Sequence, residues 1–127
     1  MEIDFHYELV GEPNIMPLKE LILRPKEIVM VLPYISGRDL YLHMRQAPDG
    51  RMTEEKCHLV FKQVFFALKA CHRRKIVHRD IKPENIMVDY DFTVYLSDLG
   101  LAIRLPKHGT VKGRAGTPCY YPYEMVK

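Results

Sequence analysis

The most informative segment of this 127-residue chain is His78-Arg79-Asp80-Ile81-Lys82-Pro83-Glu84-Asn85. It lies between two short apolar runs, residues 76–77 and 86–88, which are too brief for helices and predict small strands. Asp98-Leu99-Gly100 follows 13 residues after Asn85. A charged surface turn is the simplest alternative, but a solvated turn does not require this combination of carboxylate, amine and amide groups at fixed spacing.

Together the two motifs resemble the catalytic loop and the metal-binding triplet of protein kinases. In that family an aspartate accepts the proton of the attacked hydroxyl, and oxygen ligands hold magnesium. The resemblance implies that Asp80 orients the nucleophile and that Lys82 offsets charge on the transferred group. Asn85 would be the third catalytic residue after Asp80 and Lys82. Together with Asp98 it would hold Mg²⁺ next to ATP, because amide and carboxylate oxygens are hard ligands. Lys82 is typical of members that act on serine or threonine, whereas Leu99 replaces the family's usual phenylalanine.

The resemblance extends toward the C-terminus. Gly116-Thr117-Pro118-Cys119-Tyr120 resembles the family's substrate-positioning loop, which gives Thr117 a positioning role, and Glu124 fits the final acid of the Ala-Pro-Glu motif. Thr110 is the candidate phosphorylation site of this activation segment. Arg79 would receive that phosphate, and an ordinary surface salt bridge is the alternative for its guanidinium group.

Toward the N-terminus, residues 29–40 resemble the fifth strand and the hinge of the kinase domain. The resemblance makes Leu32 the gatekeeper and directs the backbone of Pro33 and Ile35 toward the adenine of ATP. Proline is tolerated at this first hinge position because only its carbonyl group is used. Met87 would form the floor under the base.

Two further features concern the small lobe. Glu12-Pro13-Asn14-Ile15 is similar to the His-Pro-Asn-Ile segment that joins the regulatory helix to the fourth strand, and Glu2 fits the glutamate of that helix if one residue is inserted before Asn14. The family's glycine-rich phosphate loop and its phosphate-positioning lysine have no counterpart in these 127 residues. We therefore expect phosphoryl transfer by this chain to be impaired.

The resemblance implies an α+β, protein-kinase-like fold with part of the small lobe and the N-terminal half of the large lobe. Residues 1–32 would end the small lobe, 33–37 would form the hinge, and 38–127 would form the large-lobe core with the catalytic loop and the activation segment. The expected activity is ATP-dependent phosphorylation of serine or threonine in protein substrates. The alternative is a catalytically inactive decoy or docking module that binds a kinase or its substrates.

Local patterns predict the elements around these motifs. Thr53 is a good N-cap, and Glu54 and Glu55 favour the start of a helix about twenty residues long. The other predictions are helices over 2–10 and 39–45, a hairpin of strands 15–23 and 27–32, short strands at 76–77, 86–88 and 93–96, and a long loop over 100–127.

Along the long helix, six apolar residues recur at helical spacing: Cys57, Val60, Phe61, Val64, Leu68 and Cys71. This stripe predicts the face that packs against the core. In the family the same helix is covered by a following helix. We therefore also expect self-association, or binding of a kinase-like partner, through this stripe.

The composition argues against several classes of protein. Nineteen Lys and Arg residues against sixteen Asp and Glu give a net charge of +3, which predicts neither nucleic-acid binding nor attachment to a membrane surface. Cys57, Cys71 and Cys119 form no Cys-x-x-Cys pair, and no apolar run approaches the ~20 residues of a membrane span. We expect an intracellular protein, in the cytoplasm or the nucleus.

Residues 86–94 offer a rival interpretation. They resemble the first motif of haloacid-dehalogenase-like phosphatases, Asp-x-Asp-x-Thr, with Asp89 in the place of the nucleophile and Asp91 as the second acid. The chain after Val94 has no later acidic pair to hold magnesium and is too short for a parallel sheet. Both aspartates are therefore interpreted as residues of a hairpin turn.

Overall fold

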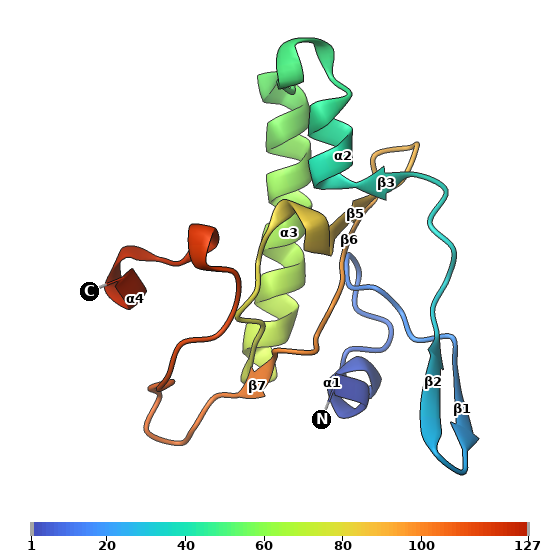
Figure 1. Ribbon diagram of the computed structural model, residues 1–127, viewed down its shortest axis with the longest axis vertical. Helices are drawn as coiled ribbons and strands as arrows, with labels where there is room; N and C mark the ends of the chain where they lie inside the picture. The colour runs from blue at the N-terminus through green and yellow to red at the C-terminus, as the bar shows by residue number, and fades with distance from the viewer. Residues whose placement is uncertain (1, 127) are drawn as a thin grey trace.

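One long helix runs along much of the molecule, and some of the short strands lie beside it, whereas a two-stranded hairpin and the last helix stand apart from it (Figure 1). The computed structural model describes residues 2–126. The helices are α1 (Glu2–Glu8), α2 (Leu40–Arg45), α3 (Glu54–Arg73) and α4 (Tyr123–Val126). The strands are β1 (Glu20–Arg24), β2 (Glu27–Val31), β3 (Arg38–Asp39), β4 (Ile76–Val77), β5 (Ile86–Val88), β6 (Val94–Leu96) and β7 (Ile103–Arg104). Single turns of 3-10 helix are η1 (Pro48–Gly50), η2 (Pro83–Asn85) and η3 (Pro118–Tyr120).

The long helix α3 begins where the sequence predicts. The hydroxyl oxygen of Thr53 accepts a hydrogen bond from the amide of Lys56 at 3.4 Å, and Glu54 and Glu55 place negative charge in the first turn. The helix has 20 residues, as expected, and ends on basic side chains. Neither α3 nor any shorter helix within residues 2–126 is long and apolar enough to cross a membrane.

The buried face of α3 differs in part from the predicted stripe. Val60, Val64 and Cys71 are buried as predicted, but Phe61 is 71% exposed, and Ala67 lies in the core instead. A helix turns by about 100° per residue, so the neighbours Val60 and Phe61 cannot both face the core. Spacing alone does not choose between them. The other two members of the stripe lie half-buried at the edge of this face: Cys57 and Leu68.

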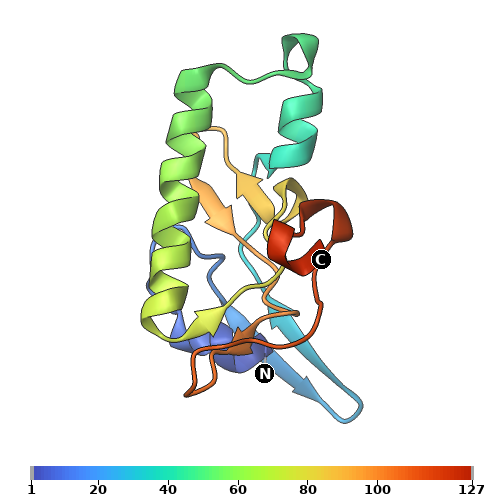
Figure 2. The same cartoon turned by 90° about the vertical axis from the view of Figure 1, so that its left-hand side faces the viewer.

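The strands form three small antiparallel sheets: β1 with β2, β4 with β7, and a central sheet in the order β3-β5-β6. Figure 2 shows the β1–β2 hairpin projecting at the end of the molecule that carries α1. The predicted hairpin is confirmed, but its first strand begins at Glu20 rather than at Ile15. Ile15 is buried and forms a parallel bridge with Leu96, so it belongs to the core.

The segment predicted as a long loop, 100–127, contains regular structure. Ile103 pairs with Val77 across β7 and β4, and α4 forms near the end of the segment. Pairing with a strand far away in the sequence leaves no local periodicity, which explains the wrong prediction. The remaining elements are confirmed within two residues; the first helix ends at Glu8, and Asp39 caps α2.

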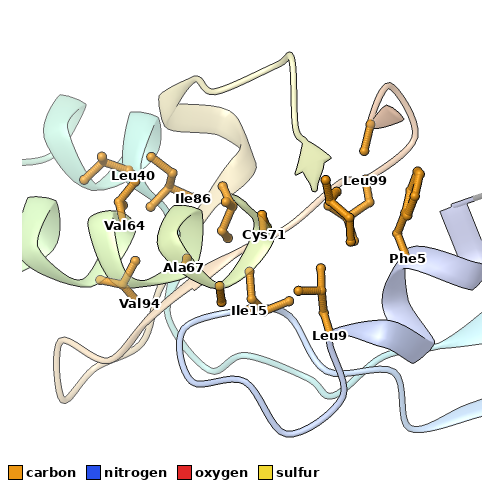
Figure 3. Packing of buried hydrophobic residues seen from close by; sticks show 14 of the residues in the cluster. Phe5, Leu9, Ile15, Leu40, Val64, Ala67, Cys71, Ile86, Val94 and Leu99 are labelled. Atoms are coloured by element: carbon orange, nitrogen blue, oxygen red, sulfur yellow. The ribbon is translucent and has the colours of Figure 1, made fainter. Parts of the chain in front are cut away.

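The core joins the N-terminal residues to α3 and the central sheet, as Figure 3 shows. Phe5 and Leu9 belong to the same buried cluster as Val64 and Cys71 of α3. Leu99, which stands where the family usually has phenylalanine, is 1% exposed in this cluster. The smaller aliphatic side chain therefore still anchors its segment in the core.

Two side-chain amides tie the N-terminal segment to α3 and to the β5–β6 hairpin. Asn14 Nδ2 donates hydrogen bonds to Gln63 Oε1 and to the carbonyl of Val94, both at 2.9 Å. Gln63 Oε1 also accepts one from the amide of Val94 at 2.9 Å, and its Nε2 donates to the carbonyl of Phe92 at 2.8 Å. Asn14 has φ 64°, a left-handed conformation that asparagine tolerates better than most residues. These bonds fix the position of the hairpin against α3.

Asn14→Ala is expected to lower the free energy of unfolding by about 2 kcal/mol, because it removes two hydrogen bonds and leaves a Cβ in a left-handed conformation. Asn14→Gly is the matched control. Glycine relieves the backbone strain but also lacks the amide, so we expect a loss of about 1 kcal/mol. Urea denaturation measures both values. Wild-type stability in both variants would show that this network does not hold the hairpin.

Candidate active site

A buried histidine supports the loop between β4 and β5. The ring of His78 is 2% exposed; its Nδ1 accepts a hydrogen bond from the amide of Asp80 at 3.3 Å, and its Nε2 donates to the carbonyl of Ser97 at 3.0 Å. Burial lowers the pKa of His78, and the bond to Ser97 and the nearby carboxylates oppose this shift only in part. The neutral ring is therefore a fixed support for the loop backbone.

The carboxylate of Asp80 lies at the centre of a hydrogen-bonded cluster and is almost completely buried. Its Oδ1 accepts hydrogen bonds from the amide and the hydroxyl of Thr117 at 2.9 and 2.8 Å. Its Oδ2 accepts from Lys82 Nζ at 2.8 Å and from Asn85 Nδ2 at 3.1 Å. The structure thus brings together four of the predicted site residues, which we call the Asp80 cluster.

Opposite charges balance within the Asp80 cluster. Burial alone would raise the pKa of Asp80, but hydrogen bonds from Lys82 and Thr117, together with the positive charge of Lys82, bring it below its usual range. The hydrogen bond to Asp80 in turn raises the pKa of Lys82. Lys82 Nζ also donates to the hydroxyl of Thr117 at 2.9 Å. Both charged groups are therefore ionised at neutral pH and held in place.

The side-chain amide of Asn85 has one defined orientation. Its Nδ2 donates to the backbone carbonyl of Asp80 at 2.9 Å as well as to the carboxylate, so the nitrogen side of the amide is turned toward Asp80. This orientation leaves Oδ1 as the oxygen that can bind a cation. The backbone carbonyl of Asn85 accepts from the amide and the hydroxyl of Ser97, at 2.9 and 3.0 Å, which links the start of β5 to the end of β6.

Asp98 follows β6 in a left-handed conformation, with φ 62°. Its Oδ1 accepts a hydrogen bond from the amide of Gly100 at 3.1 Å, and the residue is exposed. Its negative charge favours the protonated forms of Lys82 and His78, so it lies within electrostatic reach of the Asp80 cluster. Glu2 of α1 lies on the same side, because a Cβ on Gly100 would be 3.6 Å from Glu2 Oε2.

The residues predicted to contact adenine lie in two segments, which the pairing of β3 with β5 brings together. Leu32, Pro33 and Ile35 lie in the stretch between β2 and β3, where Leu32 is exposed and the other two are half-buried. Met87 is half-buried in β5, where it pairs with Asp39 of β3. The pairing of β3 with β5 therefore holds the end of this stretch beside the strand of Met87.

Arg79 binds the backbone of the segment that follows Asp98. Arg79 Nε donates to the carbonyl of Leu101 at 2.7 Å, and its guanidinium forms no ion pair within residues 2–126. The salt bridge considered as its alternative role is therefore wrong. Thr110 is exposed in the loop after β7, and Glu124 is exposed in α4.

Sequence reasoning missed the role of Gly116. Its φ is 104°, and a Cβ there would lie 2.3 Å from the carbonyl oxygen of Arg79. Only glycine allows this close approach, which places Thr117 against Asp80. A glycine directly before Thr117 was the available signal, but the contact that requires it is made with a residue far away in the sequence.

Three ion pairs around the end of α3 were also missed. The carboxylate of Glu12 pairs with Arg73 Nη2 at 3.0 Å and with Arg74 Nη1 at 2.6 Å. Arg104 of β7 forms an ion pair with Glu8 of α1 and donates to the carbonyl of Arg74 at 2.6 Å. These contacts tie α1 and the segment after Asp98 to α3, and no local pattern in the sequence signals them.

Asp89 and Asp91 serve the turn of the β5–β6 hairpin. Asp89 Oδ1 accepts a hydrogen bond from the amide of Tyr90, and Asp91 Oδ1 accepts one from the amide of Thr93, both at 2.8 Å. The interpretation as turn residues is confirmed. In the described part of the chain, no three side chains of His, Cys, Asp or Glu gather in a way that could hold a metal ion.

Comparison with known proteins supports the same family. The protein kinase domain family matches residues 1–127. The chain is 38% identical over 125 residues to sucrose non-fermenting protein kinase 1 of Fusarium virguliforme, which covers 98% of this chain and 17% of that protein. It is 36% identical over 121 residues to the SNF1-like protein kinase ssp2 of Schizosaccharomyces pombe, covering 95% and 20%. With the carbon catabolite-derepressing protein kinase of Saccharomyces cerevisiae, it shares 34% identity over 121 residues, covering 95% and 19%.

The chain thus spans about a fifth of the length of these curated relatives. The family match covers every residue, and the mixture of helices and small sheets agrees with it. The chain therefore belongs to the protein kinase family, and its predicted α+β kinase-like fold and serine/threonine kinase resemblance are confirmed.

Proposed function

We propose that the chain performs ATP-dependent phosphoryl transfer to serine or threonine residues of protein substrates. The observation that carries this proposal is the Asp80 cluster, in which one carboxylate and one ammonium group are held by hydrogen bonds. Phosphoryl transfer needs little covalent work from the protein. It needs an oriented hydroxyl group and charges placed where the transferred group passes.

Asp80 is the proposed acceptor of the hydroxyl proton. Its lowered pKa keeps it ionised at neutral pH, and Thr117 fixes its Oδ1 through two hydrogen bonds. Thr117 belongs to the segment that we expect to position the substrate, so the same contact places that segment next to the acceptor. Lys82, 2.8 Å from Asp80 Oδ2, supplies positive charge that stabilises the transferred phosphoryl group.

Asn85 and Asp98 are the proposed magnesium ligands. An amide oxygen and a carboxylate fit a hard divalent cation. The hydrogen bonds to Asp80 leave the Oδ1 of Asn85 for this role, and the carboxylate of Asp98 is exposed. When bound, Mg²⁺ would neutralise negative charge on the phosphates of ATP.

The proposed domain division places the hinge at residues 33–37, between a small-lobe part, 1–32, and a large-lobe core, 38–127. Gly37 supports this boundary, since a Cβ there would lie 1.8 Å from the carbonyl oxygen of Val88 in β5. The end of the proposed hinge is therefore in close backbone contact with the central sheet. This contact supports a boundary between residues 1–32 and 38–127 at the hinge.

The hinge and the central sheet supply the proposed adenine site. Pro33 has no amide hydrogen, so it offers only its carbonyl, whereas Ile35 offers both backbone groups. Leu32 is the proposed gatekeeper, and Met87 on β5 the proposed floor under the base. Thr110, exposed after β7, remains the proposed phosphorylation site; Arg79 would exchange its bond to the carbonyl of Leu101 for the phosphate.

Asp80→Asn is expected to reduce transfer of radiolabelled phosphate from ATP to a basic protein by ~10²- to 10⁴-fold, because the variant cannot accept the hydroxyl proton. Asp91→Asn, which removes a charge in the β5–β6 turn, is the control and should leave the rate unchanged. The wild-type rate should fall below the ~1 per second of active kinases, since residues 1–127 contain no glycine-rich loop. Equal transfer by wild type and Asp80→Asn would contradict the proposal.

The nucleotide site can be tested without turnover. Calorimetric titration with ATP and magnesium should release heat that Asp98→Ala abolishes and Asp91→Asn retains. Equal heat from Asp98→Ala would contradict the metal assignment and leave the role of Asp80 to the transfer assay.

Gly116→Ala is expected to separate Thr117 from Asp80, because the new Cβ would collide with the carbonyl oxygen of Arg79. Hydrogen exchange of the Thr117 amide, which donates to Asp80, should become at least about tenfold faster. Gly113→Ala is the matched control. Gly113 also has a positive φ, 89°, but a Cβ there meets nothing within 4 Å. Equal protection of the Thr117 amide in both variants would mean that this contact does not hold the segment.

A second candidate function, docking through self-association, is favoured by the exposed aromatic side chains of α3. Phe61 and Phe65 are 71% and 63% exposed and lie four residues apart on one face, so we propose this face, in place of the predicted stripe, as the contact surface. Glu54 and His72 lie on the same face, 18 residues or five helical turns apart. Two copies of α3 packed antiparallel would place the acidic first turn of one chain against the basic last turn of the other. A second copy of this chain is therefore the occupant we propose.

Replacing both Phe61 and Phe65 by Asp is expected to turn the dimer into a monomer in light scattering, because each substitution places a charge in the apolar contact. Leu59→Asp, on another exposed part of α3, is the control and should leave the dimer intact. A folded wild-type monomer at high concentration would contradict self-association through this face.

A further inference from the structure

A cavity of about 370 Å³ lies between α2, the start of α3 and the β5–β6 hairpin. No residue of the Asp80 cluster lines it, and none of the proposed nucleotide contacts does. This volume lies in the range typical of ligand sites in proteins. Lys56 and Tyr90 line the cavity and are exposed, so a ligand can reach it from the surface.

Positive charge dominates the walls of this cavity. Arg38 of β3 and Lys56 of α3 both line it, and neither forms an ion pair with the described residues of the chain. The one carboxylate in the walls is Asp89, whose Oδ1 accepts a hydrogen bond from the amide of Tyr90. The same positive charges act on His43, which also lines the cavity. Burial lowers the pKa of His43 most, and the charges of Lys56 and Arg38 lower it further.

An apolar wall lies beside these charges. The ring of Phe92 meets His43 edge-on with centroids 5.2 Å apart, and Lys56 Nζ lies 5.2 Å from the centroid of Phe92. Val88 and Ala47 also line the cavity. The cation–π contact holds the ammonium group next to the ring, so the cationic and apolar parts of the wall are in place before a ligand arrives.

We infer that this cavity binds an acidic segment of a protein partner, with a Glu or Asp side chain on Arg38 and Lys56 and an adjacent apolar side chain on Phe92. The planar guanidinium of Arg38 suits a carboxylate, with which it can form two parallel hydrogen bonds. Tyr90, 73% exposed, lines the cavity and offers an aromatic surface to an extended backbone. Binding here is independent of phosphoryl transfer, because the site uses none of its residues.

A fluorescent decapeptide with the central sequence Glu-Leu-Glu is the probe, and fluorescence polarisation with the full 127-residue chain measures its binding. We expect Arg38→Gln and Lys56→Gln each to weaken binding about tenfold, the usual effect of losing one charge-assisted hydrogen bond. Lys62→Gln, which alters another exposed lysine of α3 outside the cavity, is the matched control and should bind like wild type. Higher salt should weaken binding, since partly exposed charges are screened.

Three results would overturn the inference: equal binding of a Gln-Leu-Gln peptide, wild-type affinity in Lys56→Gln, or equally strong competition by inorganic phosphate or acetate, which would indicate a site for any small anion. If Arg38→Gln lowers the melting temperature, NMR of the wild-type chain decides. The peptide should then shift the amide signals of Gly37, His43 and Phe92 and leave those of α4 unchanged. Shifts at α4 instead would place binding elsewhere and reject the site.

Discussion

The side-chain amide of Gln63 is the contact on which the position of the site depends. A hairpin of two three-residue strands buries too little surface to fix its own place against a helix. Gln63 fixes that place, because its oxygen accepts hydrogen bonds from Asn14 and Val94 and its nitrogen donates to the turn. The same hairpin carries Asn85 just before its first strand and Asp98 just after its second. Bonds made on α3 therefore determine where the two proposed oxygen ligands stand.

The second constraint is electrostatic. A buried carboxylate without partners is unfavourable by several kcal/mol, so Asp80 needs donors around it. Lys82 and Asn85 come from its own loop, and Thr117 comes from a segment 37 residues later. The need to compensate this charge joins the two segments, and the absence of a side chain at Gly116 allows them to approach. Local backbone preference contributes little to this part of the geometry.

Features with a local cause could be predicted from the sequence. The cap at Thr53 and the acidic first turn indicated α3, and the spacing within residues 78–85 indicated the loop whose carboxylate, ammonium and amide groups do meet. Features decided by distant residues could not. The pairing of β7 with β4 leaves no periodicity, and the choice between Val60 and Phe61 depends on which other elements cover α3.

Cys71 lies in the core at 0% exposure, and burial raises the pKa of its thiol to about 11. Alkylating reagents attack the thiolate, so at neutral pH this sulfur is both inaccessible and in the unreactive form. Cys119, in contrast, is exposed. The rate of alkylation at Cys119 is therefore set by the chemistry of the reagent, and the rate at Cys71 by how often the core around α3 opens. Comparing the alkylation rate of Cys71 with that of Cys119 therefore measures how often the core around α3 opens locally.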